Sequence, residues 1–419
     1  MDSSPPPSLA TLPLELLSNI ITYLPFKRHI FSLLLTCKRL YHATYPRLWQ
    51  SLESNPKERY SYTTNAKNRK TGLRRLGDIA KEIGTDVLGF KYLKYILFWP
   101  ADLEADSAWV ESGLLAVISG QIVARRIQLR CVEFVLDTEV NGEALEFLKV
   151  LKEHSKDWPQ KLRIRINVPW SKELLPLITE NFRLEDITYL RLRYDEDEPS
   201  GGTGQGVEIT IDNIKRLTNL LQKLPFLEDL EINGPEHPDE IFETPIQPLL
   251  PALYQLQNAI SELKKLHKLY TSDLLFHPSF FITPPENVKK LVIAQGTSAE
   301  WWRKFSRCSF TKLEELTIHV GRVLECSKWA SPDDIDVRSG AKDFVFGMGY
   351  LELKSLKKLQ ADSGVGYGLG PEDFFDLVLA NNPGLDKESR KHCEFMTQRV
   401  KPILNQRRRK RRAPGAYSQ

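Results

Sequence analysis

A six-residue apolar pattern, L-x-x-L-x-L, recurs along most of this 419-residue chain and constrains its fold more than any other feature. In the second half of each copy apolar residues alternate with others, which is the period of a β-strand with one buried face. We therefore predict a strand at each copy. The copies start at Leu93, Leu129, Ile187, Leu227, Val288 and Leu313, and weaker copies start at Leu162, Leu266 and Leu356.

Between the predicted strands the apolar residues follow helical spacing. Strands that alternate with helices form parallel sheets with crossover connections. Two α/β architectures satisfy this order: a leucine-rich-repeat-like solenoid with parallel strands, or a closed α/β barrel. The leading leucine of each copy would fill the interior of a stacked coil, which favours the solenoid. The helical segments are residues 142–154, 172–181, 211–224, 251–263, 299–307 and 371–379, and irregular insertions cover 195–206, 234–251 and 321–340.

The amino-terminal segment, residues 12–25, has the pattern of a short helix. Pro13 suits a first helical turn because its missing N–H would be unpaired there, and Pro25 ends the helix. Two more apolar segments, 30–35 and 38–44, follow closely, so we predict three short helices. A unit this small carries more large apolar side chains than it can bury alone, so some of them await a partner. One apolar stripe is formed by Leu17, Ile20, Ile21 and Leu24.

The order of residues in this segment resembles an F-box. The resemblance rests on Leu12-Pro13-x-Glu15-Leu16-Leu17-x-x-Ile20-x-x-x-Leu24-Pro25, then Leu34, Cys37-Lys38-x-Leu40-Tyr41 and Pro46-x-Leu48-Trp49. It implies that the helices dock onto a Skp-type adaptor, which in turn binds a cullin. The residues that it assigns to adaptor binding are Leu12, Pro13, Leu16, Leu17, Ile20, Ile21, Leu24, Pro25, Leu34, Cys37, Leu40, Leu48 and Trp49.

The irregular repeats after this segment resemble those of fungal-type F-box proteins with degenerate leucine-rich repeats. The resemblance implies a substrate-recognition subunit of an SCF-type E3 ubiquitin ligase, which is a non-catalytic adaptor that binds an unknown protein substrate through its repeats. Two alternatives remain open. The helices could serve only the chain's own fold, in a non-catalytic repeat scaffold or nuclear interaction module, and a closed barrel would fit an enzyme.

The predicted domain organisation follows from these patterns. It consists of a disordered amino terminus at 1–8, the F-box at 9–53, a polar connector at 54–89, the repeat domain at 90–383, a carboxyl-terminal helix at 384–404 and a basic disordered tail at 405–419.

No motif in the sequence indicates catalysis, a metal site or a cofactor. The five cysteines form no CxxC pair. The glycine run 201–206 is followed by Val207-Glu208 where a phosphate loop needs Lys and Ser or Thr. The run 364–370 lacks the third glycine of a dinucleotide fingerprint, and the aspartates of 333–336 lack the spacing of a calcium loop.

The charge and the hydropathy of the sequence limit where the protein can reside and which partners it can bind. The formal net charge is +4, and the six basic residues Arg407, Arg408, Arg409, Lys410, Arg411 and Arg412 account for the excess, so nucleic acid is not an expected partner of the remainder. This basic cluster has the composition of a nuclear localisation signal, although it also fits a solvated tail. The apolar stretches are shorter than the ~20 residues that span a bilayer. We expect a nuclear or cytoplasmic protein without a membrane segment.

A solenoid would present the residues between its buried positions on a concave surface. The strand pattern places Arg165, Arg191, Arg193, Glu231, Tyr270 and His319 there, together with Thr317 and Gln360. The three arginines suggest an acidic or phosphorylated protein segment, because guanidinium groups pair bidentately with such groups. Ordinary solvent-exposed arginines on a strand would give the same pattern.

Overall fold

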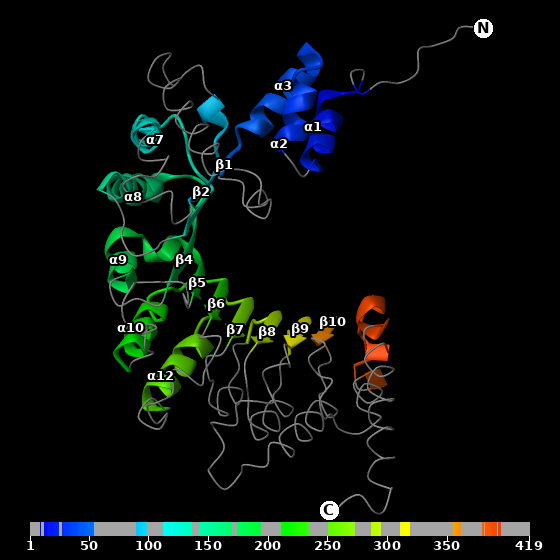
Figure 1. Ribbon diagram of the computed structural model, residues 1–419. Helices are drawn as coiled ribbons and strands as arrows, with labels where there is room; N and C mark the ends of the chain where they lie inside the picture. Colours follow the sequence, from blue (N-terminus) through cyan, green and yellow to red (C-terminus); the bar gives the residue numbers. More distant parts are fainter. Residues whose placement is uncertain are drawn as a thin grey trace, which may run out of the picture. The chain divides into compact units, whose positions relative to one another are not determined.

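The computed structural model shows amino-terminal helices followed by parallel strands that alternate with helices (Figure 1). The chain divides into two compact units, residues 1–167 with 177–187, and residues 168–176 with 188–419. The structure describes residues 9, 12–24, 27–53, 89–98, 112–135, 142–169, 174–193, 211–233, 250–272, 286–294, 311–318, 355–361, 379–380, 382–391 and 393–394.

Three short helices open the first unit: α1 (Leu14–Thr22), α2 (Lys27–Leu34) and α3 (Lys38–Leu48). Pro13 stands immediately before α1 in an extended conformation, and its carbonyl accepts the Leu17 N–H at 3.0 Å. Helix α3 packs against both α1 and α2. The core of this three-helix module consists of Leu17, Ile21, Ile30, Leu40 and Ala43, against which Leu12, Leu24, Leu33 and Leu48 pack.

The first unit also contains strands β1 to β4 in chain order, each paired in parallel with the next. Helices α7 and α8 pack together in this unit. The elements are β1 (Ser51–Glu53), η3 (Gly89–Tyr92), β2 (Tyr95–Phe98), α7 (Leu114–Val123), β3 (Cys131–Val135), α8 (Gly142–His154), η4 (Ser155–Asp157), β4 (Arg163–Pro169), α9 (Leu174–Asn181) and η5 (Leu184–Asp186). Residues 168–169 of β4 and 174–176 of α9 are assigned to the second unit.

In the second unit helices α10 and α12 alternate with strands as far as β7, and strands β5 to β10 also follow chain order. Because β5 and β10 stand at opposite ends of this order, the unit does not close into a barrel, and the solenoid prediction is favoured over the barrel alternative. Its elements are β5 (Ile187–Arg193), α10 (Ile211–Leu221), β6 (Asp229–Asn233), α12 (Leu250–Ser261), β7 (Lys268–Ser272), β8 (Lys290–Ala294), β9 (Glu315–Ile318) and β10 (Lys358–Ala361).

One apolar residue from each strand stacks in register with its neighbours, and we call these residues the ladder. In the first unit Leu52, Ile96, Val132 and Ile164 are partners, and in the second unit Leu190, Leu230, Leu269, Leu291, Leu316 and Leu359 are. All of them are buried. Each is the fourth residue of a predicted L-x-x-L-x-L copy, except Leu52, which belongs to no copy, and Ile164, which is the third residue of the weaker copy that starts at Leu162. The sequence pattern therefore predicted the strands β2 to β10 and the register of all of them but β4.

Backbone hydrogen bonds repeat with the same period at the start of the strands. The His267 carbonyl accepts the N–H groups of Lys289 and Lys290 at 2.8 and 3.0 Å, and the Glu314 carbonyl accepts those of Lys357 and Lys358. Each bend therefore satisfies two donors of the following repeat, so that the polar backbone at the bends is paired.

The last strand does not end as an open edge. After β10 the chain returns at residues 382–386, where the Asp386 N–H donates to the Lys357 carbonyl as the next repeat would. Helical residues follow at 387–391. The buried Ser389 hydroxyl accepts the Leu359 N–H at 3.0 Å, so this segment covers the β10 edge, which would otherwise invite pairing with another chain.

Several predicted features lie outside the described residues. They are the segments 1–8, 54–88 and 405–419, the insertions 195–206 and 321–340 and nearly all of 234–251, the helices 299–307 and nearly all of 371–379, and the glycine and aspartate runs. The predicted domain boundaries therefore stay predictions.

Candidate functional site

An exposed apolar stripe runs along α1 on the side away from the core. Leu16 is 49% exposed, Ile20 41% and Tyr23 85%, whereas Leu17 and Ile21 are buried. Leu16, Ile20 and Tyr23 stand at i, i+4 and i+7, which places them on one face of the helix. Helix α1 therefore carries apolar residues on two faces, one in the core and one exposed. Exposed apolar side chains that lie together mark a surface for a partner.

Helix α2 adds a second exposed apolar pair. Ile30 points into the core, but Phe31 is 50% exposed and Leu35, just after the helix, is 67% exposed. The Leu35 N–H donates to the Phe31 carbonyl at 3.3 Å, so the helical path continues through Leu35 and keeps the two side chains one turn apart. The three-helix module thus presents large apolar side chains from two helices to solvent.

Helix α3 connects the start of α1 with the residues that follow the module. The Arg39 guanidinium donates to the Leu12 carbonyl at 2.7 Å, which ties α3 to the start of α1. At its other end Trp49 packs on Phe90 with ring centroids 5.8 Å apart and lies against Gly89. The apolar body of Trp49 therefore faces the first repeat within the same unit.

The structure distributes the predicted adaptor-binding residues over three environments. Leu17, Ile21 and Leu40 are buried; Leu12, Leu24, Leu34, Leu48 and Trp49 are partly buried; Pro13, Leu16, Ile20 and Cys37 are exposed, and Pro25 lies outside the described residues. The exposed group, and the accessible part of the partly buried group, can meet a partner without unfolding the module. The buried group supports such a surface indirectly.

The predicted concave surface of the repeats carries ion pairs between neighbouring strands. In the first unit Arg165 Nε lies 3.1 Å from Glu133 Oε2. In the second unit Arg191 Nε lies 3.4 Å from Glu231, whose other carboxylate oxygen accepts Lys268 Nζ at 2.6 Å. Neither arginine Nε–H is aligned for a hydrogen bond with its carboxylate, so these contacts are ion pairs without a linear hydrogen bond. An acidic ligand would have to compete with these carboxylates.

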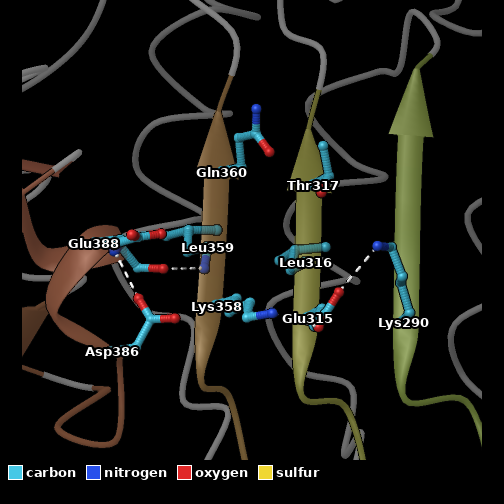
Figure 2. Close-up of a pocket in the computed structure, with 10 residues that line it drawn as sticks. Lys290, Glu315, Leu316, Thr317, Lys358, Leu359, Gln360, Asp386 and Glu388 are labelled. Atoms are coloured by element: carbon cyan, nitrogen blue, oxygen red, sulfur yellow. Dashed lines mark hydrogen bonds and ion pairs between the residues drawn. The ribbon is translucent and has the colours of Figure 1, made fainter. Parts of the chain in front are cut away.

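A polar hollow of about 360 Å³ lies at the β8 to β10 end of the second unit (Figure 2). Thr317 and Gln360 line it, as the concave-surface prediction placed them on the open face. Asp386, Glu388 and Ser389 of the returning segment form its far wall. Its volume is at the lower end of the range of small-molecule sites, but its lining is polar rather than apolar, which fits a surface contact better than an enclosed ligand.

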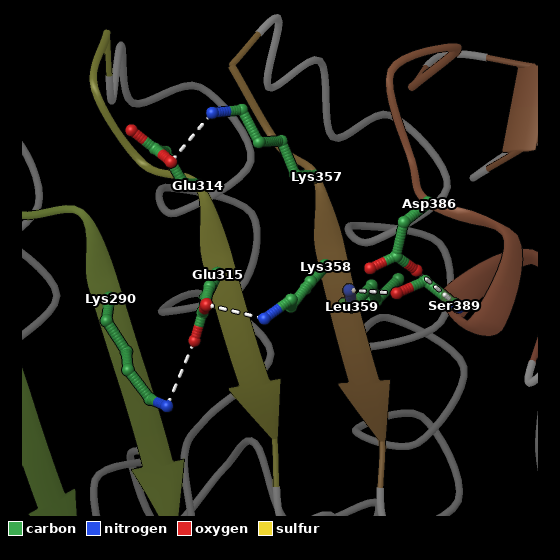
Figure 3. Close-up of polar contacts among 8 residues, drawn as sticks. All are labelled: Lys290, Glu314, Glu315, Lys357, Lys358, Leu359, Asp386 and Ser389. Atoms are coloured by element: carbon green, nitrogen blue, oxygen red, sulfur yellow. Dashed lines mark hydrogen bonds and ion pairs between the residues drawn. The ribbon is translucent and has the colours of Figure 1, made fainter. Parts of the chain in front are cut away.

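Glu315 organises the charges of this hollow (Figure 3). Its two carboxylate oxygens contact Lys290 and Lys358, each at 3.0 Å. Hydrogen bonds from these lysines lower the pKa of Glu315, and the hydrogen bond with Glu315 raises the pKa of Lys358. Next to the hollow, Lys357 pairs with Glu314 at 2.8 Å, and the hydrogen bond from Lys357 lowers the pKa of Glu314. Asp386 accepts the Ser389 N–H at 2.7 Å, which caps the helix that follows and lowers the Asp386 pKa.

The remaining predicted site residues divide as follows. Tyr270 is half-buried on β7, next to Glu231 in the β6–β7 register. The side chain of Arg193, all of His319, and the cluster Arg407 to Arg412 lie outside the described residues. Within the described ranges no group of His, Cys, Asp and Glu could hold a metal ion. No helix among those described is long and apolar enough to cross a membrane.

Sequence reasoning missed several exposed residues. Tyr23, Phe31 and Leu35 were not assigned to the adaptor surface, although Tyr23 continues the i, i+4, i+7 spacing of Leu16 and Ile20. The lysine and glutamate pairs before the ladder leucines were also overlooked. They recur as Lys289-Lys290, Glu314-Glu315 and Lys357-Lys358, and this repetition was the available signal.

Residues 9–54 match the family model described as F-box-like. The match covers the three-helix module and β1, and ends before the repeats. A search of curated proteins found no match to this chain. The chain therefore carries an F-box-like domain at its amino-terminal end, joined to a sheet of parallel strands.

Proposed function

We propose that this protein is a substrate-recognition subunit of an SCF-type ubiquitin ligase. In this proposal the F-box-like module docks a Skp-type adaptor, which links it to a cullin, and the strands after it are degenerate leucine-rich repeats of the fungal type that capture a protein substrate. The protein itself would be non-catalytic. It would raise the effective concentration of the substrate at the ubiquitin-transfer site.

The observation that carries the proposal is the exposed apolar stripe of Leu16, Ile20 and Tyr23 on a helix of the F-box-like domain. Burying a leucine or isoleucine side chain completely is worth about 1.5–3 kcal/mol. Because Leu16 and Ile20 are already about half covered, docking would gain roughly half of that for each of them. Tyr23 is 85% exposed and has more surface left to bury. The α2 pair, Phe31 and Leu35, adds comparable apolar surface, so a helical adaptor groove can obtain its affinity from a few anchors.

The repeats support a receptor role through their shape and polarity. Within each unit, parallel strands in chain order leave one face of side chains available. In the second unit this face carries Tyr270, Thr317 and Gln360 together with paired charges. Paired charges and neutral hydrogen-bonding groups fix orientation at a protein interface more than they add affinity, which suits selection of a substrate.

The docking proposal is tested by co-expressing the chain with a Skp-type adaptor and measuring capture. We expect that Leu16→Asp combined with Ile20→Asp abolishes capture, because two carboxylates would be buried unpaired in the interface. Far-UV circular dichroism should stay unchanged, since both side chains point to solvent. Leu17→Asp would instead unfold the module, because Leu17 is 1% exposed, and cannot report on docking.

A matched control pair exists in the second unit. Phe226 and Tyr254 are 41% and 37% exposed, similar to Leu16 and Ile20. Phe226→Asp combined with Tyr254→Asp should leave adaptor capture at the wild-type level. If the stripe variant kept full capture, or if the folded wild-type chain bound no adaptor, the module would serve only the chain's own fold. The chain would then be a repeat scaffold or nuclear interaction module without a ligase role.

Nuclear or cytoplasmic location belongs to the same proposal. The basic cluster Arg407 to Arg412 has the composition of a nuclear localisation signal. A fluorescent fusion in which these six residues are replaced by serine should lose nuclear enrichment. An unchanged distribution would contradict a targeting role for the cluster.

A further inference from the structure

From β6 to β10 the two residues before each ladder leucine include charged side chains, whose sign changes between most neighbouring strands. They are Glu228-Asp229 before β6, His267-Lys268 before β7, Lys289-Lys290 before β8, Glu314-Glu315 before β9 and Lys357-Lys358 before β10. Where the sign changes between neighbouring strands, ion pairs form, as between Glu314 and Lys357 and between Glu315 and Lys358 (Figure 3).

The alternation fails between β7 and β8. The strand register places Lys268 opposite Lys290, and the Lys289 N–H donates to the His267 carbonyl, so the two basic pairs are direct neighbours. The preceding turn adds Lys264 and Lys265, both exposed, and the Lys264 carbonyl accepts the Asn287 side chain from the β8 turn. We call Lys264, Lys265, His267, Lys268, Lys289 and Lys290 the β7–β8 seam.

Neighbouring like charges destabilise a sheet, and the seam is relieved in part at its borders. There the charge of Lys289 also helps to lower the pKa of Glu314. Lys268 pairs with Glu231 on β6 and Lys290 pairs with Glu315 on β9. In the described part of the chain no ion pair joins Lys264, Lys265 or Lys289 to a carboxylate. The turns also carry two exposed carboxylates, Glu262 and Glu286. The five lysines of the seam outnumber them, so the seam keeps an excess of positive charge.

We propose that the β7–β8 seam is a docking surface for a short acidic segment of a partner protein. Ammonium groups form charge-assisted hydrogen bonds with carboxylates or phosphoryl groups, and such a ligand would offset the repulsion that the fold leaves in place. This would be a site where stability is exchanged for binding.

The acidic residues on either side of the seam favour an acidic peptide over a nucleic acid as its partner. Glu228-Asp229 flank it at β6 and Glu314-Glu315 flank it at β9. Strands are about 4.8 Å apart, so the basic surface is only two strands wide between acidic ones. A nucleic-acid backbone carries charge continuously and would meet these carboxylates, whereas an acidic peptide stretch can end within the seam.

The acidic segment would belong to the substrate that the repeats capture, so this inference rests on the proposed function. Its test contains no adaptor, so failure of the seam and failure of adaptor docking are read separately. The full chain is used with Arg407 to Arg412 replaced by serine, because the tail would otherwise bind an acidic probe. The probe is fluorescein-labelled hexaglutamate, and fluorescence anisotropy is measured at about 50 mM salt, where surface charges are weakly screened.

The seam variant is Lys264→Glu combined with Lys265→Glu. The control, Lys215→Glu combined with Lys223→Glu, makes the same net charge change at exposed lysines elsewhere in the second unit. We expect the seam variant to weaken hexaglutamate binding at least about tenfold and the control to weaken it less than about twofold. The urea midpoint of the seam variant should equal or exceed that of the parent, because repulsion is removed.

Four outcomes would overturn the proposal. They are absence of hexaglutamate binding to the parent, equal loss in both variants, a lowered urea midpoint of the seam variant, and tighter binding of a short single-stranded DNA than of hexaglutamate. The last outcome would assign the seam to nucleic acid.

Discussion

Gly89→Ala tests whether the F-box-like module is built into the first repeat or only tethered to it. A Cβ at Gly89 would lie 2.4 Å from Trp49 Cγ, 2.5 Å from Cδ1 and 2.9 Å from Cβ. Carbon atoms in contact prefer about 3.5–4.0 Å. Since the overlapping atoms are close to the Trp49 backbone, a small rotation of the ring cannot relieve the overlap.

The position of Trp49 is fixed on both sides. Helix α3 ends at Leu48, and β1 begins at Ser51 and pairs with β2. The Gln50 carbonyl between them accepts the N–H groups of Lys94 and Tyr95. Overpacking typically costs about 1–3 kcal/mol, and this restraint places Gly89→Ala near the upper end.

The same geometry sets the cost of removing the ring. A fully buried tryptophan loses about 3–5 kcal/mol on truncation to alanine. Trp49 is half-buried, so Trp49→Ala should cost about 2 kcal/mol. In the double variant the overlaps with Cγ and Cδ1 disappear with the ring, and only the 2.9 Å approach to the Cβ of residue 49 remains. We expect the double variant to be only slightly less stable than Trp49→Ala alone, which is a coupling of about 2 kcal/mol.

The assay is urea denaturation of the four proteins followed by far-UV circular dichroism. If Gly89→Ala costs the same free energy of unfolding with and without Trp49, the contact does not join the module to the repeat. A flexible tether would also make Gly89→Ala nearly neutral in both backgrounds.

Three further outcomes follow from the structure. Burial raises the pKa of the Cys393 thiol to about 11, so at about pH 8 iodoacetamide should modify the exposed Cys37 and leave Cys393 unmodified until the chain unfolds; equal labelling rates in the folded protein would contradict the described burial. Glu315→Lys should lower the urea midpoint because it replaces two ion pairs with repulsion, and 1 M salt, where the Debye length is about 3 Å, should remove most of the difference; no shift at low salt would refute the pairing. Ser389→Ala should cost about 1–3 kcal/mol, because it leaves the buried Leu359 N–H unpaired, and hydrogen exchange at that amide should accelerate; unchanged exchange would contradict the edge cover.

The repeats were predictable because their signal is local. The L-x-x-L-x-L copies predicted the nine strands β2 to β10 and, except at β4, the ladder register, since a one-residue slip would turn every ladder side chain away from the core. Helix α8 begins and ends where the apolar spacing predicts.

Elements that depend on distant residues were missed. Strand β1 is only Ser51–Glu53, and its extended form is set by pairing with Tyr95 to Leu97, far along the chain. Helix α7 was overlooked because its residues are apolar on nearly all faces, as in Leu114, Leu115 and Ile118, so the helical period is weak.

In the candidate sites, too, local patterns were predictable and contacts between distant residues were not. Helical spacing predicted the F-box-like module, but only the packing shows that Leu17 supports the core while Leu16 faces solvent. The sequence also suggested a basic concave surface from Arg165 and Arg191. Because Glu133 and Glu231 lie on the neighbouring strands, both arginines have carboxylate partners, which a linear reading cannot show.

The most direct test of the central claim is the dissociation constant between the purified full chain and a purified Skp-type adaptor, measured by isothermal titration calorimetry. We expect a one-to-one complex with a dissociation constant below about 1 μM, corresponding to about −8 kcal/mol. Leu16→Ala combined with Ile20→Ala should weaken binding at least about tenfold, and Phe226→Ala combined with Tyr254→Ala should keep the wild-type affinity. A folded chain that gives no binding heat at several temperatures, or equal affinity in all three proteins, would contradict the central claim.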